Sequence, residues 1–193
     1  MGVPLHRFGP SPAELEYLTS TRLEPWAAVW IPGGRIRTTR RRGDGTYAVG
    51  QLTFVGKSRL WIGADVLHTG SSDEVWFVAV GDDPRFGHHD HEIRFRPRRA
   101  PIDRYPADLD LRPFLPPGRA YELLSWYRDA TIDGAYDRVV VDEALLITAV
   151  TGERLLIRTD RDTPLEVLAT RHEEEIEAAI ARAQFVRSSF ECG

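Results

Sequence analysis

The pattern of apolar and polar positions between residues 26 and 96 is typical of β-strands joined by turns. Short segments rich in β-branched and aromatic residues are separated there by glycine, proline, serine and aspartate. A long hairpin is expected around Gly43–Gly45, because glycines adopt the positive φ angles that a tight turn needs. The predicted strands are 26–31, 35–55 (the hairpin), 59–64, 74–80 and 91–97. Strands at this spacing favour a meander.

The second half of the chain changes character twice. Residues 97–118 contain six of the thirteen prolines of the chain, so this segment is predicted to be an irregular connector. The apolar residues of 119–132 fit neither the helical nor the strand period, and that segment stays unassigned. Residues 137–160 predict a hairpin that turns near Gly152.

Two helices are predicted from the same start signal. In Ser11–Glu14 and in Thr163–Glu166, a hydroxyl residue is followed by proline and, three positions after the hydroxyl residue, by glutamate. This order predicts a capping box with proline at the first helical position. The first helix is expected to end before Pro25, and the second to continue to about Arg187. The stripe of the second helix contains Leu165, Leu168, His172, Ile176, Ala179, Ile180 and Ala183.

Together these elements predict an α+β fold in a single domain spanning residues 1–193. The sheet is expected to be mostly antiparallel and strongly curved, or a partly open β-barrel, formed from about Trp26 to Phe95 and Val139 to Thr159. A short N-terminal helix and a long C-terminal helix are expected to pack on it. Within the domain, three parts can be distinguished: a β-meander at 24–96, a proline-rich connector at 97–118, and a β-hairpin plus the C-terminal helix at 119–193.

Composition narrows the class of protein. Cys192 is the only cysteine, which excludes a disulfide within the chain and a cysteine–metal cluster. No stretch of about 18 apolar residues predicts a membrane-spanning helix, and no apolar core of a secretory signal is visible near the start. We therefore expect a cytoplasmic protein with no membrane partner. Lys57 is the only lysine among 25 basic residues, which is typical of a GC-rich bacterial genome.

The segment Gly87–Arg99 holds three histidines and four arginines, and it contains the first candidate site. On a strand, His89 and His91 share a face, so their imidazoles could converge on one divalent metal ion. Such an ion needs further ligands, for which the candidates are His6, His68, His172, Glu74 and Glu92. We favour the other interpretation, in which this segment is a polar loop or strand edge and the protein has no cofactor.

Arginines repeat along one face of two predicted strands, and these stripes are the second candidate site. The two sets are Arg35, Arg37 and Arg41, and Arg94, Arg96 and Arg98. Guanidinium groups bind phosphates and carboxylates, and neighbouring aromatic rings could stack on bases. The net charge of −4 argues against a typical nucleic-acid-binding domain, which carries a basic excess. The alternative is that both stripes are only the solvent-exposed faces of half-buried strands.

Two further features carry possible chemistry. Asp142 and Glu143 interrupt an apolar strand, so at least one of the two carboxylates is expected to point inward. A buried carboxylate requires a partner such as an arginine, which would make it structural or part of a site. His172 is expected to be a packed core residue of the second helix rather than a catalyst.

Three classes of function remain open. The favoured hypothesis is a non-catalytic binding or regulatory protein whose arginine-striped strands recognise an anionic partner, either an acidic protein or a nucleic acid. The second is a small enzyme or ligand-binding barrel with a pocket in the sheet; a metal-dependent version of it would use His89 and His91. The third is a homo-oligomer or protein-interaction module that uses the C-terminal helix and tail.

Overall fold

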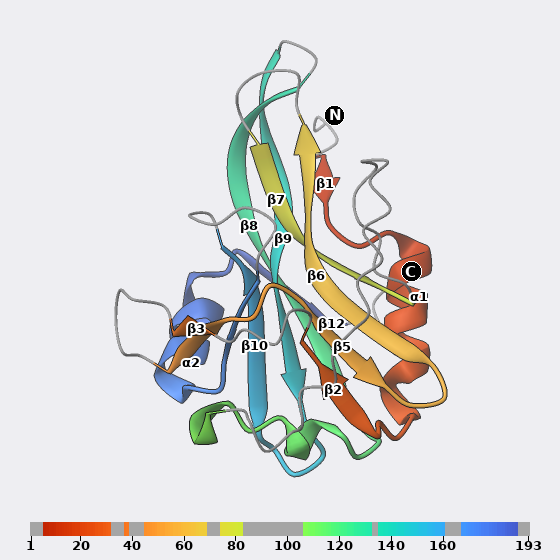
Figure 1. The fold of residues 1–193 in the computed structure, drawn as a ribbon. Helices are drawn as coiled ribbons and strands as arrows, with labels where there is room; N and C mark the ends of the chain where they lie inside the picture. The colour runs from red at the N-terminus through yellow and green to blue at the C-terminus, as the bar shows by residue number, and fades with distance from the viewer. Residues whose placement is uncertain are drawn as a thin grey trace.

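The computed structural model describes residues 6–31, 37–38, 45–68, 74–82, 106–132, 135–160 and 167–188. Most of these residues lie in strands, with two short α-helices (Figure 1). The strands are β1 (Arg7–Phe8), β2 (Ala28–Trp30), β3 (Arg37–Thr38), β4 (Thr46–Ala48), β5 (Leu52–Val55), β6 (Arg59–His68), β7 (Glu74–Gly81), β8 (Ala120–Ile132), β9 (Ala135–Thr148), β10 (Arg154–Thr159), β11 (Val167–Thr170) and β12 (Phe185–Ser188). The helices are α1 (Pro12–Ser20) and α2 (Glu173–Arg182), with short 3-10 turns at Thr21–Leu23, Ala107–Leu109 and Arg112–Phe114.

The strands form two open sheets. The larger, eight-stranded sheet has the order β12-β8-β9-β10-β11-β4-β3, and the short strand β1 pairs with β9 in parallel. The four-stranded sheet has the order β2-β5-β6-β7. All pairs other than β1 with β9 are antiparallel. The large sheet therefore draws strands from both ends and from the middle of the chain.

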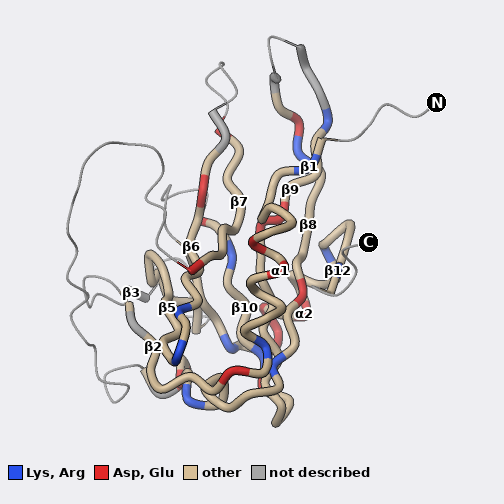
Figure 2. Tube along the Cα trace, turned by 90° about the vertical axis from the view of Figure 1, so that its right-hand side faces the viewer, with Lys and Arg blue, Asp and Glu red and all other residues tan. Residues whose placement is uncertain are grey.

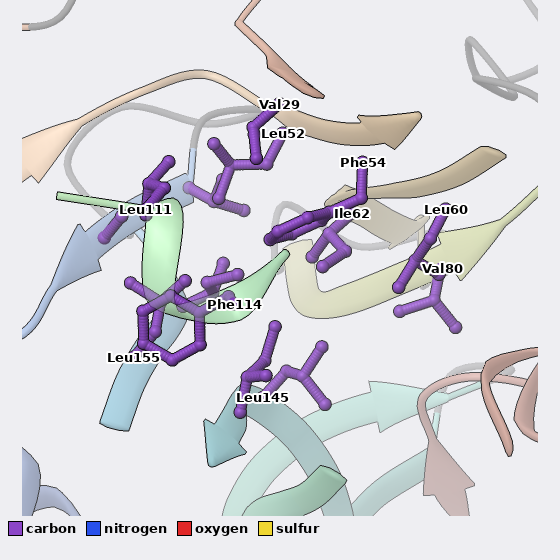
Figure 3. Packing of buried hydrophobic residues seen from close by; sticks show 14 of the residues in the cluster. Val29, Leu52, Phe54, Leu60, Ile62, Val80, Leu111, Phe114, Leu145 and Leu155 are labelled. Carbon is purple, nitrogen blue, oxygen red and sulfur yellow. The ribbon is translucent and has the colours of Figure 1, made fainter. Parts of the chain in front are cut away.

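The main core lies between the two sheets. Phe54 and Ile62 of the small sheet and Leu145 and Leu155 of the large sheet belong to one buried cluster, which Phe114 of the connector also joins (Figure 3). The opposite face of the large sheet is covered by α2 through a second, smaller cluster. The buried members of that cluster are Leu124, Ala144, Leu146, Leu156, Ile176 and Ala179. Because both faces of β8, β9 and β10 are covered, their sequences are apolar at consecutive positions.

The capping box of the first helix is confirmed. The backbone N–H of Glu14 donates to Ser11 Oγ over 3.3 Å, and the Glu14 carboxylate accepts from the backbone N–H of Ser11 over 2.8 Å. Several predicted strands are also confirmed, namely β2, β6, β7 and the β9–β10 hairpin. Gly152 lies in the turn of that hairpin with φ +95°. The unassigned segment 119–132 is the long strand β8.

The prediction of a long C-terminal helix is wrong. The last helix is α2, which begins at Glu173 and ends at Arg182, and the four residues before Arg171 form strand β11. Every residue of β11 is buried between β10 and β4, so tertiary pairing overrides the helical spacing of its apolar residues. The proposed cap at Thr163–Glu166 lies outside the described residues. His172 is exposed at the N-cap of α2 rather than packed in a core.

The prediction of an α+β fold with a strongly curved or barrel-like sheet is also wrong. The fold is mostly β, and its two sheets are open: the large one ends at β12 and β3, and the small one at β2 and β7. The physical reason lies in the hairpin of residues 35–55. Its β3 pairs with β4, and β4 pairs with β11 of the large sheet, whereas β5 pairs with β2 and β6 of the small one. The predicted meander is therefore divided between two layers.

One buried arginine fixes the described part of the proline-rich connector. Arg119 is 1% exposed, and its guanidinium donates to carbonyl oxygens of Phe114 (3.0 Å), Leu115 (3.1 Å) and Thr21 (2.9 Å). Its guanidinium carbon also lies 5.1 Å from the ring centroid of Trp26. These contacts join the connector to the end of α1 and the start of β2, so Arg119 has a structural role.

Candidate functional site

Most residues of the two predicted sites lie outside the part of the chain that the structure describes. His89 and His91 lie outside the described residues, as do five of the six stripe arginines: Arg35, Arg41, Arg94, Arg96 and Arg98. Arg37 lies on β3, where its backbone pairs with Ala48 at the edge of the large sheet. Among the described residues there is no group of three or more histidine, cysteine, aspartate or glutamate side chains that could hold a metal ion.

The most unusual polar cluster in the described structure surrounds Asp142. The side chain of Asp142 is 0% exposed. Ser125 Oγ donates to Asp142 Oδ1 over 2.6 Å, and Arg187 Nη2 donates to Oδ2 over 2.6 Å. Arg7 Nη1 lies 3.3 Å from Oδ1. We call these four residues the Asp142 cluster; they confirm that one carboxylate of the Asp142–Glu143 pair points inward and has arginine partners.

The cluster is built across four adjacent strands. Asp142 of β9 faces Ser125 of β8, which in turn faces Phe185 of β12, and Arg7 comes from β1 on the other side of β9. The pairing of β8 with β9 shifts by one residue here: Leu124 faces Ala144, but the next residue of β8, Ser125, faces Asp142. Glu143 is the extra residue of this bulge. It pairs with Arg128 over 2.7 Å, apart from the Asp142 cluster.

Gly9 makes room for the buried carboxylate. A Cβ atom on Gly9 would lie 2.1 Å from Asp142 Oδ2, which is far inside van der Waals contact. The chain just after β1 therefore packs directly against the carboxylate. Burial without partners would be costly for a charged group, and here two guanidinium groups and one hydroxyl compensate for the lost water.

The arginines of the cluster extend from the buried carboxylate toward solvent. The side chain of Arg7 is 35% exposed and that of Arg187 is 25% exposed. Two positive charges meet one negative charge, so the cluster has an excess of one positive charge. Carboxylate and guanidinium groups hold one another in place, which reduces the side-chain entropy that each arginine would lose on binding a further anion.

Aromatic side chains adjoin the same arginines. The rings of Tyr127 and Phe185 are T-shaped with centroids 5.3 Å apart. The guanidinium carbon of Arg7 lies 5.8 Å from the centroid of Phe185, and that of Arg138 lies 4.3 Å from the centroid of Tyr127. Asp129 is directly opposite Arg138 in the β8–β9 register and moderates its charge. The face therefore combines fixed guanidinium groups with exposed ring surface.

Two tyrosine–aspartate pairs elsewhere have perturbed acid–base properties. Tyr47 donates from its hydroxyl to Asp108 over 2.6 Å, and burial together with that hydrogen bond raises the pKa of Tyr47 to about 12. Tyr17 donates to Asp82 over 3.1 Å, and burial followed by the Asp82 hydrogen bond raises the pKa of Tyr17 to about 12. Both tyrosines therefore stay neutral at physiological pH, and both pairs join separate segments of the fold.

The sequence indicated that at least one carboxylate of the Asp142–Glu143 pair points inward, but it did not distinguish the two and did not indicate the arginine partners. Arg7 lies in a two-residue strand, and Arg187 was expected at the end of a helix, so no periodicity linked them to Asp142. A usable signal was the polar pair inside an apolar strand, which demands cationic partners without naming them.

In comparisons with protein-family models, curated proteins and solved structures, nothing matches this chain. Within the described ranges, neither helix is long and apolar enough to cross a membrane.

Proposed function

We propose that this protein is a binding module without a reaction of its own, and that its arginine side chains recognise an acidic segment of a partner protein. The observation that carries the proposal is the Asp142 cluster, in which Arg7 and Arg187 converge on one buried carboxylate and keep a positive excess at the surface. A buried ionised carboxylate is expensive for the fold. Its role here is to hold two guanidinium groups ready for an anion.

The remaining features of the chain support the same chemistry. The arginine stripes predicted at Arg35, Arg37 and Arg41 and at Arg94, Arg96 and Arg98 would add further anion-binding surface. Among anions, we favour acidic protein over nucleic acid, because the chain has a net charge of −4. The proposal places the module in the cytoplasm, and a homo-oligomer is compatible with it.

The test is a binding and thermal-shift panel on purified, chelator-treated protein. The probes are a poly-glutamate peptide, single-stranded DNA, RNA and divalent metal ions, each measured at low and high salt. A probe at 100 times its dissociation constant should stabilise the fold by about 2.7 kcal/mol. We expect a shift with poly-glutamate that weakens as salt screens the charges.

Variants then locate the binding surface. Arg7→Gln and Arg138→Gln should weaken poly-glutamate binding, because each removes one positive charge from the face that carries the Asp142 cluster. Lys57→Gln is the matched control, since it removes one charge from an exposed turn between β5 and β6. A variant pair Arg37→Ala and Arg96→Ala tests the predicted stripes separately.

Other outcomes would contradict the proposal. A stronger shift with DNA or RNA would identify a nucleic acid as the partner. A shift only with a metal ion, lost in His89→Ala with His91→Ala, would favour the metal-dependent enzyme. A panel with no shift at all would refute anion recognition.

A further inference from the structure

We propose that the acidic partner segment binds as an added β-strand along β12, with alternating acidic and apolar side chains. This inference rests on the proposed function and specifies the surface and shape of the partner. It starts from the position of β12 in the fold. Within the described residues, β12 pairs only with β8 and forms one end of the large sheet. Figure 2 shows β12 beside β8 on the outer side of the sheet.

β12 lacks proline and lysine, two residues that protect an outer strand from pairing. Such strands typically carry proline, lysine or a bulge, which discourage the addition of another chain. The four residues of β12 include no proline or lysine. Its one charged side chain, Arg187, donates to the buried Asp142. Phe185 and Val186 are 36% and 45% exposed, respectively.

The charges near β12 determine which side chains an added strand should carry. Phe185 and Arg187 are two residues apart and share one strand face, the face of the Asp142 cluster. The guanidinium of Arg7 also reaches this strand, since its carbon lies 5.8 Å from the centroid of the Phe185 ring. Neighbouring strands are about 4.8 Å apart, and the guanidinium of Arg187 is directed across β8 to Asp142 on β9. Every second side chain of an added strand would therefore lie on the face that carries the positive excess, without direct contact with Arg187. Those side chains should be Glu or Asp.

The other face of β12 requires different side chains. Val186 points to the face opposite Phe185 and Arg187, the face on which α2 packs through Leu124, its cross-strand neighbour. The alternate residues of an added strand would lie beside Val186 there, so they should be apolar. The predicted segment therefore reads acidic, apolar, acidic, apolar. Peptides that add to sheet edges combine backbone hydrogen bonds with alternate side-chain contacts in this way.

A second copy of this chain is a poorer occupant of the same edge. Antiparallel pairing of β12 with β12 would bring Arg187 close to Arg187 of the other copy. Like charges across neighbouring strands are destabilising. An acidic segment instead places opposite charges there, so charge complementarity favours it.

The experiment compares two peptides of about six residues with alternating glutamate and valine. One has an ordinary backbone, and the other carries N-methyl groups on the amides of one edge, which removes hydrogen-bond donors while leaving the charge unchanged. We expect the ordinary peptide to bind at least about tenfold more tightly, because strand addition depends on several backbone hydrogen bonds. It should also slow hydrogen exchange of the β12 amides.

Two variants with the same change of charge locate the edge. Val186→Glu places a carboxylate on β12 beside the added strand, and it should weaken binding of the ordinary peptide at least about tenfold. Val150→Glu is the matched control: Val150 is also an exposed valine, 64% exposed in the β9–β10 turn, and its substitution should leave binding unchanged.

The outcomes separate this inference from the proposed function. Equal binding of both peptides, weakened by Arg7→Gln, would overturn strand addition and leave anion recognition standing. Binding of neither peptide and no response to poly-glutamate would overturn both. Self-association in light scattering, abolished by Val186→Glu but not by Val150→Glu, would show that β12 pairs with a second copy and would overturn the acidic partner.

Discussion

The Asp142 cluster makes a sharp prediction about stability. Asp142→Asn preserves the shape of the side chain but removes its charge and replaces one acceptor by an N–H donor. In the substituted side chain, Oδ1 can still accept a hydrogen bond from Ser125 Oγ, which lies 2.6 Å from Asp142 Oδ1 in the structure. The new amide NH2 group would replace Oδ2, which lies 2.6 Å from Arg187 Nη2 in the structure. Two hydrogen-bond donors would then face one another without an acceptor between them. Arg7 and Arg187 would then repel one another without a carboxylate between them.

The magnitude follows from the contacts that are lost. A hydrogen bond to a charged group contributes about 1.5–3 kcal/mol, which applies to the Arg187 contact. The Arg7 contact with Oδ1 is longer, at 3.3 Å, and Arg7 is 35% exposed, so the loss of its charge attraction to the carboxylate adds about 1 kcal/mol or less. We expect Asp142→Asn to lower the free energy of unfolding by about 3 kcal/mol, near the lower end of the range for breaking buried ion pairs.

Urea denaturation followed by tryptophan fluorescence measures this change. With a slope of about 2 kcal/mol/M, a loss of about 3 kcal/mol moves the midpoint down by roughly 1.5 M. The control is Glu143→Gln at the neighbouring position, which removes the charge from a part-buried pair with Arg128 and should cost less, about 1.5 kcal/mol. A loss within about 0.5 kcal/mol for Asp142→Asn would refute the buried-charge reasoning.

A combined variant tests the same reasoning from the other direction. Replacing Asp142 by Leu together with Arg7→Met and Arg187→Met removes all three charges at once. Because no buried charge is then left unpaired, the combined variant should be more stable than Asp142→Asn, measured in the same urea titration. If it is also less able to bind poly-glutamate, the cluster is retained for binding rather than for stability.

Three further predictions concern other parts of the fold. Gly9→Ala places a Cβ 2.1 Å from Asp142 Oδ2 and should cost about 2 kcal/mol or more in urea denaturation, whereas Gly50→Ala, which has open space at φ +68°, should cost only about 1 kcal/mol for its backbone conformation. Arg119→Met removes the hydrogen bonds that the guanidinium donates to the carbonyl oxygens of Phe114, Leu115 and Thr21, although Leu115 and Thr21 keep a backbone donor. The substitution should lower the free energy of unfolding by roughly 2 kcal/mol, and Arg119→Lys should recover only part of this loss because an ammonium cannot reach all three oxygens. Full stability of Arg119→Met would contradict the structural role. The pKa values of Tyr17 and Tyr47 are raised from 10.0 to about 12 in the folded protein, so the stability that the two neutral hydroxyls contribute is fully present below pH 10 and is lost as the pH rises toward 12. Ultraviolet titration should show two late-ionising tyrosines, each absent in the corresponding Tyr→Phe variant. Ionisation of all tyrosines near pH 10 would contradict the assignment.

The sequence correctly predicted structure wherever local chemistry decides it. The Ser11–Glu14 box begins α1 because its capping contacts lie within four residues. The turn at Gly152 and the strands around it follow from alternation and from the φ angle that glycine allows. An inward carboxylate within the Asp142–Glu143 pair could also be predicted, because a charge within an apolar strand requires a buried partner.

Predictions failed where a distant strand decides the conformation. Residues 167–170 have apolar residues at a spacing compatible with a helix, but pairing with β10 and β4 makes them a strand buried on both faces. For the same reason the 35–55 hairpin does not continue a single curved sheet, since its β4 pairs with β11 whereas its β5 pairs with β2 and β6.

The sequence by itself determined the strand-rich composition, the start of α1, the β9–β10 hairpin, and the need of the Asp142–Glu143 pair for a cationic partner. Only the tertiary structure decided which cations serve it. Arg7 and Arg187 lie 180 positions apart in the numbering, and they meet because β1 and β12 flank the β8–β9 hairpin on opposite sides. Propensity and periodicity act over a few residues, whereas strand order is set by burial of whole faces. The candidate binding surface therefore arises from the sheet rather than from a motif.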